Sequence, residues 1–589
     1  MSWRLTVILA LVLALLGGYY AYFEMKVFPQ RKQAEEEAKK IFAIKAEEIK
    51  EISLQRKDTE ILCVRDNGGW KMLKPVKSDG DGAALEKMAS ILEEAKYEKI
   101  LDKENPDLKH FGLEPPSLQV WVTKKDGTTS RKLALGGKSP TDKYVYARLD
   151  QGKNIFFMPA KIMDDLDKNV FDFRSKRLLD IKPEEVDGLE VSTDSWRVVA
   201  HRVDKQKWAM VAPLDAPAQS SKINALLRKL TQWQVKEFIS ERADDLATYG
   251  LEKPSYTIHV KAGKASSQQV LMLGNKDETK NGVFAHMKGA TNVVMLDAKI
   301  MEDLPREAFD LREKDFIVLQ REKVEKIRLT YPQRQILLAK EDKNHWVIEE
   351  PSQLRADYFK VRNLLLDADD MEITQFIDAD QPSPEESGLD APAVRAEFWI
   401  EGEKEPVGVE LGRNTEDGKA VYARQIRKNR VDMVDVKNVE RLTKTVFDLR
   451  FRKLLEFDNK DIESIQMTLA GKEFEVHRDG NKWKMTRPEK KDLKSGQVFS
   501  FLWALKDLEF KEVVSEDGKN VPSEAFEKIR LKVKLIRKND SSPGTLVIGD
   551  EIPDKKGLVY GRVEGRPLVA AVEAGLINRA QRALEKAKR

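Results

Sequence analysis

A fourfold internal repeat constrains the fold of this chain more than any other feature. Four tryptophans stand 138, 138 and 137 residues apart, each with aspartate four residues before it and proline five residues after it. A glycine and an aromatic residue farther along keep nearly the same step. The repeated positions are Trp70, Trp208, Trp346 and Trp483, then Gly136, Gly274, Gly412 and Gly549, then Tyr146, Phe284, Tyr422 and Tyr560. Five markers in register over four copies predict four tandem domains.

Each copy has the pattern of an α+β domain. Apolar and polar residues alternate over 324–329 and 462–467, which is typical of half-buried strands. Val361, Leu364 and Leu365 have helical spacing, and the other copies have apolar residues at the same places, which predicts one amphipathic helix per copy. We expect about six strands and two helices in each copy, with Gly136 and its equivalents in hairpin turns.

The repeat spacing sets the predicted domain organisation. A transmembrane anchor is expected over 1–25, a helical charged linker over 26–46, and repeat domains over 47–183, 184–321, 322–458 and 459–589, in an elongated array. The fourth copy lacks the Gly-Leu-x-x-Pro and Phe-Asp-x-Arg elements of the others and ends in a helical tail. We interpret it as the cap of the array; the alternative is a specialised docking end.

The anchor is predicted from an apolar run at the front of the chain. Leu5 to Phe23 is 19 residues without a charge, and a helix of that length spans about 28 Å, close to the thickness of the hydrocarbon core. The alternative is a cleaved signal peptide, but bulky aromatics follow the run instead of a small-residue cleavage site. Flanking charges favour a cytoplasmic body, although long domains translocate regardless of such charges, so the residues leave the orientation open.

Composition and motifs argue against an enzyme. One cysteine excludes a multi-thiolate metal site, and the six histidines fall at non-equivalent positions without metal-ligand spacing. Lysine plus arginine (103) nearly balances aspartate plus glutamate (99), so a nucleic-acid partner is not expected. The repeated residues are those that build turns and cores, not those that move protons. We therefore expect no catalytic residue, no cofactor and no metal.

Two repeated elements are candidates for contacts. A tyrosine and an arginine two residues later share a strand in three copies, and these are the candidate ligand or partner contacts: Tyr146 and Arg148, Tyr422 and Arg424, Tyr560 and Arg562. The second copy breaks this pattern with His286. The Phe-Asp-x-Arg element is interpreted as a helix cap or a buried ion pair at the junction between copies. The tryptophans are interpreted as core residues, with a stacking platform as the alternative.

The succession of motifs resembles a bacterial family of unknown function. The matching positions are Trp208 and Pro213, Tyr249-Gly250-Leu251 with Pro254, Leu273-Gly274, Tyr422-Ala423-Arg424 and Phe447-Asp448-Leu449-Arg450. Members look like single-pass proteins with tandem α+β repeats outside the cytoplasmic membrane. They are often encoded beside ABC transporter subunits of the gliding-motility (Gld) class. The resemblance implies an extracytoplasmic, periplasmic body and a transporter partner, and it supplies no catalytic residues.

Together these observations predict a non-enzymatic repeat protein of the cell envelope, anchored in the bacterial inner membrane. Its expected role is that of a scaffold or accessory subunit of a membrane complex, with an ABC transporter as the partner implied by resemblance. The alternative is a protein that binds an envelope polymer or lipid, with one site per repeat.

Overall fold

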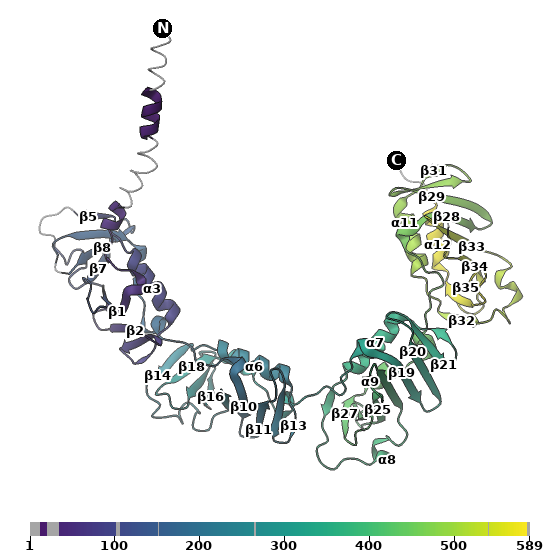
Figure 1. The fold of residues 1–589 in the computed structure, drawn as a ribbon, viewed down its shortest axis with the longest axis horizontal. Coiled ribbons are helices and arrows are strands. Elements are labelled where there is room, and N and C mark those ends of the chain that lie inside the picture. Colours follow the sequence, from purple (N-terminus) through teal and green to yellow (C-terminus); the bar gives the residue numbers. More distant parts are fainter. Residues whose placement is uncertain are drawn as a thin grey trace, which may run out of the picture. The chain divides into compact units, whose positions relative to one another are not determined.

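Four antiparallel sheets of nine strands each make up the body of the protein. The structure is a computed structural model, which describes residues 12–20, 34–101, 107–150, 152–263, 267–539 and 541–585. The chain divides into two compact units, Met1–Glu313 and Lys314–Arg589, with two sheets in each. An α+β domain therefore occurs four times in tandem (Figure 1).

The first unit holds copies one and two. Copy one consists of β1 (Ile49–Gln55), β2 (Glu60–Asp66), β3 (Gly69–Lys74), β4 (Ser78–Asp79), α3 (Gly82–Glu94), β5 (Lys99–Leu101), β6 (Leu118–Lys124), β7 (Leu133–Lys138), β8 (Tyr144–Leu149), β9 (Ile155–Pro159), α4 (Lys161–Leu166) and α5 (Val170–Phe173). Copy two consists of β10 (Val186–Ser192), β11 (Arg197–Arg202), β12 (Trp208–Ala212), β13 (Ala216–Pro217), α6 (Ser220–Gln232), β14 (Glu237–Ser240), β15 (Tyr256–Ala262), β16 (Ser267–Asp277), β17 (Gly282–Met287), β18 (Val293–Asp297), η4 (Ala298–Asp303) and η5 (Ala308–Leu311).

The second unit holds copies three and four. Copy three consists of β19 (Val324–Tyr331), β20 (Arg334–Lys340), β21 (Trp346–Glu350), β22 (Leu354–Arg355), α7 (Tyr358–Asp369), β23 (Ile373–Gln375), α8 (Pro384–Ser387), β24 (Val394–Ile400), β25 (Val407–Asn414), β26 (Ala420–Gln425), β27 (Val431–Asp435), α9 (Lys437–Leu442) and α10 (Val446–Leu449). Copy four consists of β28 (Ile462–Leu469), β29 (Lys472–Asp479), β30 (Lys482–Arg487), β31 (Lys491–Asp492), α11 (Ser495–Lys506), β32 (Glu512–Ser515), η8 (Ser523–Phe526), β33 (Leu531–Arg537), β34 (Thr545–Glu551), β35 (Leu558–Val563), β36 (Val569–Glu573) and α12 (Gly575–Ala583). Short 3-10 turns, η2 (Ala46–Glu48), η3 (Pro183–Glu185), η6 (Arg321–Lys323) and η7 (Asn459–Asp461), precede the first strand of each copy.

All four sheets have the same strand order, which in copy one is β4-β3-β2-β1-β6-β7-β8-β9-β5. The expected six strands per copy are therefore too few. The additional strands are the two-residue edge strand β4, the three-residue β5 at the other edge, and β9, which pairs with β5 and β8. β4 and β5 are too short to show an alternation that sequence periodicity could detect, and β9 is a continuous apolar run without alternation.

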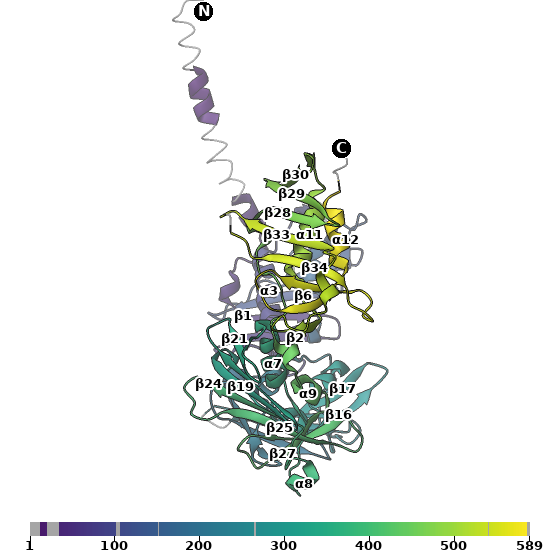
Figure 2. The ribbon, with the colours of Figure 1, turned by 90° about the vertical axis from the view of Figure 1, so that its right-hand side faces the viewer.

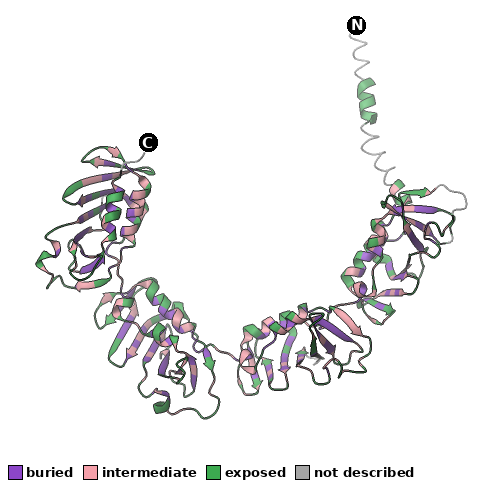
Figure 3. Cartoon of the chain, turned by 180° about the vertical axis from the view of Figure 1, so that it is seen from behind, coloured by how far each residue is buried: buried purple, intermediate pink, exposed green. Residues whose placement is uncertain are grey.

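One helix packs against the sheet of each copy. In copy three, α7 buries Val361, Leu364, Leu365 and Ala368, and these pack with strand residues and with Trp346 in one apolar cluster. All four repeated tryptophans are at most 5% exposed, so their interpretation as core residues is confirmed, and a stacking platform is excluded. Figure 3 shows buried positions recurring along the strands of every sheet.

Each core begins before the first strand of its sheet. Leu179 belongs to the core of copy two, Phe316 to that of copy three and Leu454 to that of copy four. Backbone bridges fasten these segments to the residue stretch after the central helix, as between Arg177 and Gln234. The structural start of each later copy therefore precedes the 184, 322 and 459 expected from the repeat spacing.

The expected linker over 26–46 is helical only in part. Residues 26–33 lie outside the described residues, and 34–38 are helical. Ile41, Phe42 and Ile44 are instead buried in the core of copy one. Their apolar side chains gain more from burial than a solvated helical stalk would offer.

The repeated glycines lie inside strands, not in hairpin turns, which corrects that prediction. Gly136 lies in β7 where the pairing with β8 shifts register, and the other three have the same place in their sheets. A Cβ atom at Gly412 would lie 2.2 Å from the carbonyl oxygen of Ser387, and one at Gly549 would lie 1.9 Å from that of Ala525. Glycine is required because another backbone segment crosses the strand at this point.

The expected membrane span, Leu5–Phe23, lies partly outside the described residues, which include 12–20 of it. Among the residues that the structure describes, no helix is both long and apolar enough to cross a membrane. Residues 12–20 are helical and exposed throughout (Figure 3).

Candidate functional site

Two of the three predicted tyrosines pack against the segment that crosses the sheet. The ring of Tyr146 in β8 lies 4.7 Å from that of Phe111, and Tyr560 in β35 lies 6.3 Å from Phe526 and is 4% exposed. Copy two makes the same contact with the partners exchanged, between Tyr249 and Phe284 at 5.0 Å. Tyr422 in β26 is half-buried. Packing therefore accounts for the aromatic residue at this position in three copies.

The three predicted arginines have three different environments. Arg424 pairs with the buried Glu410, with Nη2 2.7 Å from Oε2, and Arg395 binds the other oxygen of that carboxylate. Arg562 lies over the ring of Phe526, 4.2 Å from its centroid. Arg148 has a buried Nε atom that has no hydrogen-bond partner among the described residues. The structure thus brings each tyrosine and arginine onto one strand, but the three pairs do not form equivalent sites.

The arginine of Phe-Asp-x-Arg joins consecutive copies within each unit. Arg174 pairs with Glu241 of copy two and lies 3.6 Å from the ring centroid of Phe238. Arg450 likewise pairs with Glu516 of copy four. Both arginine side chains are less than a tenth exposed, at 6% and 9%.

The aspartate of the same element caps the start of a short helix. Asp172 forms a capping box with Asn169 in α5, and Asp448 forms one with Thr445 in α10. The prediction was a cap or a buried ion pair at the junction, and in copies one and three the element provides both. Each carboxylate satisfies backbone N–H groups that would otherwise lack a partner at the start of the helix.

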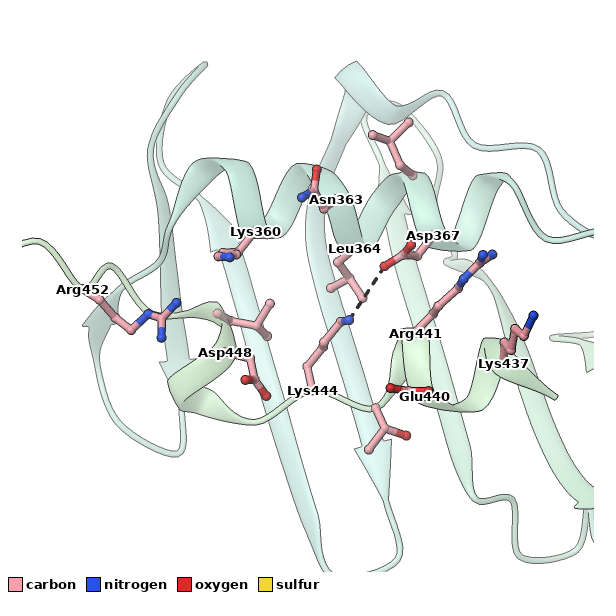
Figure 4. A pocket seen from close by; sticks show the side chains of 13 residues that line it. Lys360, Asn363, Leu364, Asp367, Lys437, Glu440, Arg441, Lys444, Asp448 and Arg452 are labelled. Carbon is pink, nitrogen blue, oxygen red and sulfur yellow. Dashed lines mark ion pairs between the residues drawn. The ribbon is translucent and has the colours of Figure 1, made fainter. Parts of the chain in front are cut away.

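Sequence reasoning missed a groove on the helical face of copy three. It encloses about 760 Å³ between α7 on one side and α9, α10 and the segment joining them on the other. The buried Leu364 and Leu449 form its floor. Figure 4 shows Lys360, Asn363 and Asp367 extending from α7, opposite Lys444 and the side chains of α9. Residues of α7 and α9 are about 77 positions apart, so only folding brings them together.

Two of the carboxylates in this groove already have partners within copy three. Asp448 accepts hydrogen bonds from the backbone N–H and the hydroxyl of Thr445, at 2.7 and 2.6 Å. Asp367 lies 3.7 Å from the ammonium of Lys444. Burial raises the pKa of the Asp367 carboxyl above its ordinary value, although Lys444 and Arg441 act in the opposite direction.

The joining segment of the groove is held from below by a tyrosine. The hydroxyl of Tyr331 donates to the carbonyl oxygen of Leu442 at 2.8 Å and accepts from the N–H of Lys444 at 2.9 Å. Burial raises the pKa of this hydroxyl. The wall that carries Lys444 is thereby fixed to the sheet.

Copy two has a smaller groove at corresponding positions. It encloses about 410 Å³ and is lined by Lys222, Lys229, Glu302, Asp303, Arg306 and Asp310, among others. Its basic and acidic side chains are equal in number, three of each. Lys229 and Asp303 form an ion pair across it.

Among the described residues, no three histidine, cysteine, aspartate or glutamate side chains are grouped so that they could hold a metal ion. Cys63 is fully buried in β2, and burial raises the pKa of its thiol to about 12. A thiol with that pKa is protonated and unreactive at neutral pH.

The fold and its repeated sites define a class of protein, a tandem array of α+β domains whose shared residues are structural. Four segments of the chain, 70–210, 208–345, 346–521 and 483–586, match the family described as "Domain of unknown function (DUF4340)". The chain belongs to this family. No curated protein matches it.

Comparisons with solved structures find distant likenesses. A DNA polymerase sliding clamp from Pseudomonas aeruginosa is 9% identical over 68% of this chain and 94% of that chain, with a TM-score of 0.12. The extracellular domain of a one-component system from B. thetaiotaomicron is 7% identical over 92% of this chain and 83% of that chain, with a TM-score of 0.08. Neither TM-score carries an inference about fold or function.

Proposed function

We propose that this protein is a non-enzymatic scaffold or accessory subunit of a membrane complex in the bacterial cell envelope. The supporting observation is the kind of residue that is repeated between the copies. The positions shared by the copies build cores, strand crossings and junctions, as Trp346, Gly412 and Arg450 do. Duplication of a scaffold without duplication of reactive side chains favours a structural role over catalysis.

The proposal includes an N-terminal anchor in the inner membrane, with the body on the periplasmic side. Its support is the uncharged run Leu5–Phe23 and the exposure of the described part of that run. Leu13, Leu15 and Leu16 are 71%, 73% and 61% exposed, so no described part of the chain covers them. Apolar side chains in such a row are stabilised by lipid.

An ABC transporter is the partner class we propose, on the strength of the family resemblance. The alternative, one ligand site per repeat, is less well supported because Arg148, Arg424 and Arg562 have different neighbours. A site repeated for one ligand would keep its charged contacts.

The test is purification of the tagged full-length chain from its native membranes in mild detergent, followed by identification of the proteins that accompany it. We expect transporter subunits in near-stoichiometric amounts. A chain that arrives alone, with its membrane association intact, would contradict the scaffold proposal.

A matched control tests the anchor separately. The double variant Leu13→Arg and Leu16→Arg places two charges in the apolar run, each of which costs about 3 kcal/mol at the centre of a membrane helix. It should move the chain from the membrane to the soluble fraction. Lys205→Arg, on a turn of copy two, should leave the fractionation unchanged. An unaltered distribution of the double variant would exclude the anchor.

A further inference from the structure

The groove of copy three has more positive charge than its own carboxylates balance. Five basic and three acidic side chains line it, which leaves a net charge of two positive. Asp448 is taken up by its contacts with Thr445, and Asp367 by Lys444. Glu440 is the remaining acidic side chain of the lining.

Three of the cations make no ion pair with any described residue. They are Lys360 on α7, and Lys437 and Arg441 on α9, so they stand on opposite walls of the same groove (Figure 4). Arg452, at one end, pairs with Glu509. Positive charges that line one groove without partners attract a counter-charge.

The groove has the size and stiffness of a binding site. Its volume of about 760 Å³ falls within the range of small-molecule pockets, about 300–1,000 Å³. Leu364 and Leu449 are buried and form an apolar floor. The side chains of Lys360, Lys437 and Arg441 at the rim are exposed and reachable from solvent. Tyr331 fixes the segment that carries Lys444, so the wall need not be ordered when a ligand binds.

Copy two provides an internal contrast. Position 229 is lysine and position 303 is aspartate, and these two pair directly. In copy three the corresponding charges are exchanged, to Asp367 and Arg441. Asp367 then pairs with Lys444, and the guanidinium of Arg441 has no ion pair within the part of the chain that the structure describes.

We propose that the groove of copy three binds a compact anion with two or more negative charges, a phosphate-bearing small molecule or headgroup. A guanidinium presents two parallel N–H donors that match phosphate oxygens, and the lysines add charge without strict geometry. This proposal does not depend on the scaffold role.

The experiment is calorimetric titration of the full-length chain in detergent with inorganic tripolyphosphate. We expect saturable binding of one tripolyphosphate per chain, weakened by added salt because the contacts are partly exposed. Arg441→Ala and Lys360→Ala should each weaken binding by about five- to tenfold, the effect of one charge-assisted contact.

Two variants separate this site from general attraction to a basic surface. Lys222→Ala removes the counterpart of Lys360 from copy two and should leave the affinity unchanged. Asp367→Asn removes a competing carboxylate and frees Lys444, so it should tighten binding by about threefold. Loss of affinity on Asp367→Asn would overturn the proposal, and so would equal losses for Lys222→Ala and Lys360→Ala. The proposal would also be overturned if the chain neither binds tripolyphosphate saturably nor binds phospholipid vesicles.

Vesicle flotation distinguishes the two sources of phosphate. The full-length chain is reconstituted so that its body faces outward, and mixed with separate vesicles of phosphatidylglycerol or of phosphatidylcholine. Bridging to phosphatidylglycerol vesicles alone, lost with Arg441→Ala, identifies a headgroup. Tripolyphosphate binding without bridging identifies a soluble anion. Bridging that Arg441→Ala does not change, without tripolyphosphate binding, would overturn the site.

Discussion

The cores of copies three and four are built in the same way, but the two copies end differently. In copy three, α9 stops at Leu442, and the chain turns over residues 443–445 into α10. In copy four, α12 starts at the corresponding position and continues to Ala583 without a break, beside α11 (Figure 2). The same sheet and the same central helix thus support two endings.

A few polar groups account for the difference. Tyr331 holds the turn of copy three by two hydrogen bonds, and Thr445 caps the helix that follows. The corresponding residues of copy four are Leu469 and Ala583, which can do neither. Copies one and three therefore break the helix and direct an arginine, Arg174 or Arg450, into the next copy of the same unit, whereas copy four keeps its helix on its own core.

The largest effect is expected from substitutions of the core tryptophan that both copies have. Trp346→Ala in copy three and Trp483→Ala in copy four should each destabilise their own copy by about 3–5 kcal/mol, because each removes a fully packed aromatic side chain. Native-state hydrogen exchange of the full-length chain measures the loss copy by copy. A large effect in only one of the two copies would mean that the tryptophan does not contribute equally to the stability of the two cores.

A smaller effect is expected where the strand is crossed. Gly412→Ala and Gly549→Ala place a methyl group against a backbone carbonyl oxygen, which should cost about 1–3 kcal/mol in either copy. The same exchange experiment measures it. Gly418→Ala is unsuitable as a control because Gly418 has a φ of 68°, whereas Gly496, which has no atom within 4 Å of an added Cβ, should tolerate alanine.

An effect of intermediate size is expected at the turn that distinguishes copy three from copy four. Tyr331→Phe should destabilise the turn between α9 and α10 by about 1–2 kcal/mol, because a carbonyl and an N–H group lose a buried partner. Faster exchange of the Lys444 amide is the measurement. Tyr358→Phe, in α7 of the same copy, should leave that amide unchanged. Equal effects of the two substitutions would show that the hydroxyl of Tyr331 does not hold the turn.

The smallest effect depends on pH. Because burial raises the pKa of Asp367, this carboxyl binds its proton more tightly in the folded chain, and ionisation costs stability as the pH rises through the folded-state pKa. Asp367→Asn should therefore stabilise copy three at pH 7 by less than about 1 kcal/mol, with no gain at about pH 3.

Asp448 provides the control of opposite sign. Burial works to raise the pKa of its carboxyl, but the hydroxyl and N–H of Thr445 lower it overall. Its ionised form therefore contributes stability above the unfolded-state pKa, and that contribution is lost as the pH falls through the folded-state pKa. Asp448→Asn should destabilise copy three at neutral pH. Denaturant unfolding at several pH values measures both variants, and the same sign for both would contradict the assignment.

The sequence predicted the parts of the fold that repeat with long periodic elements. The central helix was predicted from residues such as Leu364, and the tryptophan cores from the spacing of Trp346 and its equivalents. The two-residue edge strands could not be predicted, because they are formed by their neighbours and show no periodicity of their own. Gly136 was assigned to a turn, because a crossing by a distant backbone segment leaves the same glycine in the sequence.

The candidate groove could not be predicted for a related reason. Lys360 and Arg441 are unremarkable surface charges in sequence, and their proximity arises only when α7 and α9 pack on one sheet. Asp367 and Lys229 have opposite charges at the same place in the repeat, so alignment of the copies marks the position without showing that a groove exists there. The junction, in contrast, was predicted because Arg174 and Arg450 repeat with their helix caps.

The early start of each core bears on how such a chain can change in length. Every copy carries its own leading segment, such as the one with Leu179, and copies one and three end at an arginine, such as Arg174, that contacts the next copy. Insertion or removal of one whole period at that arginine leaves each remaining core complete and only exchanges the carboxylate that the arginine meets. Growth by tandem duplication is therefore possible in whole steps, while a cut at the first strand of a sheet would leave one core open and an apolar stub on its neighbour.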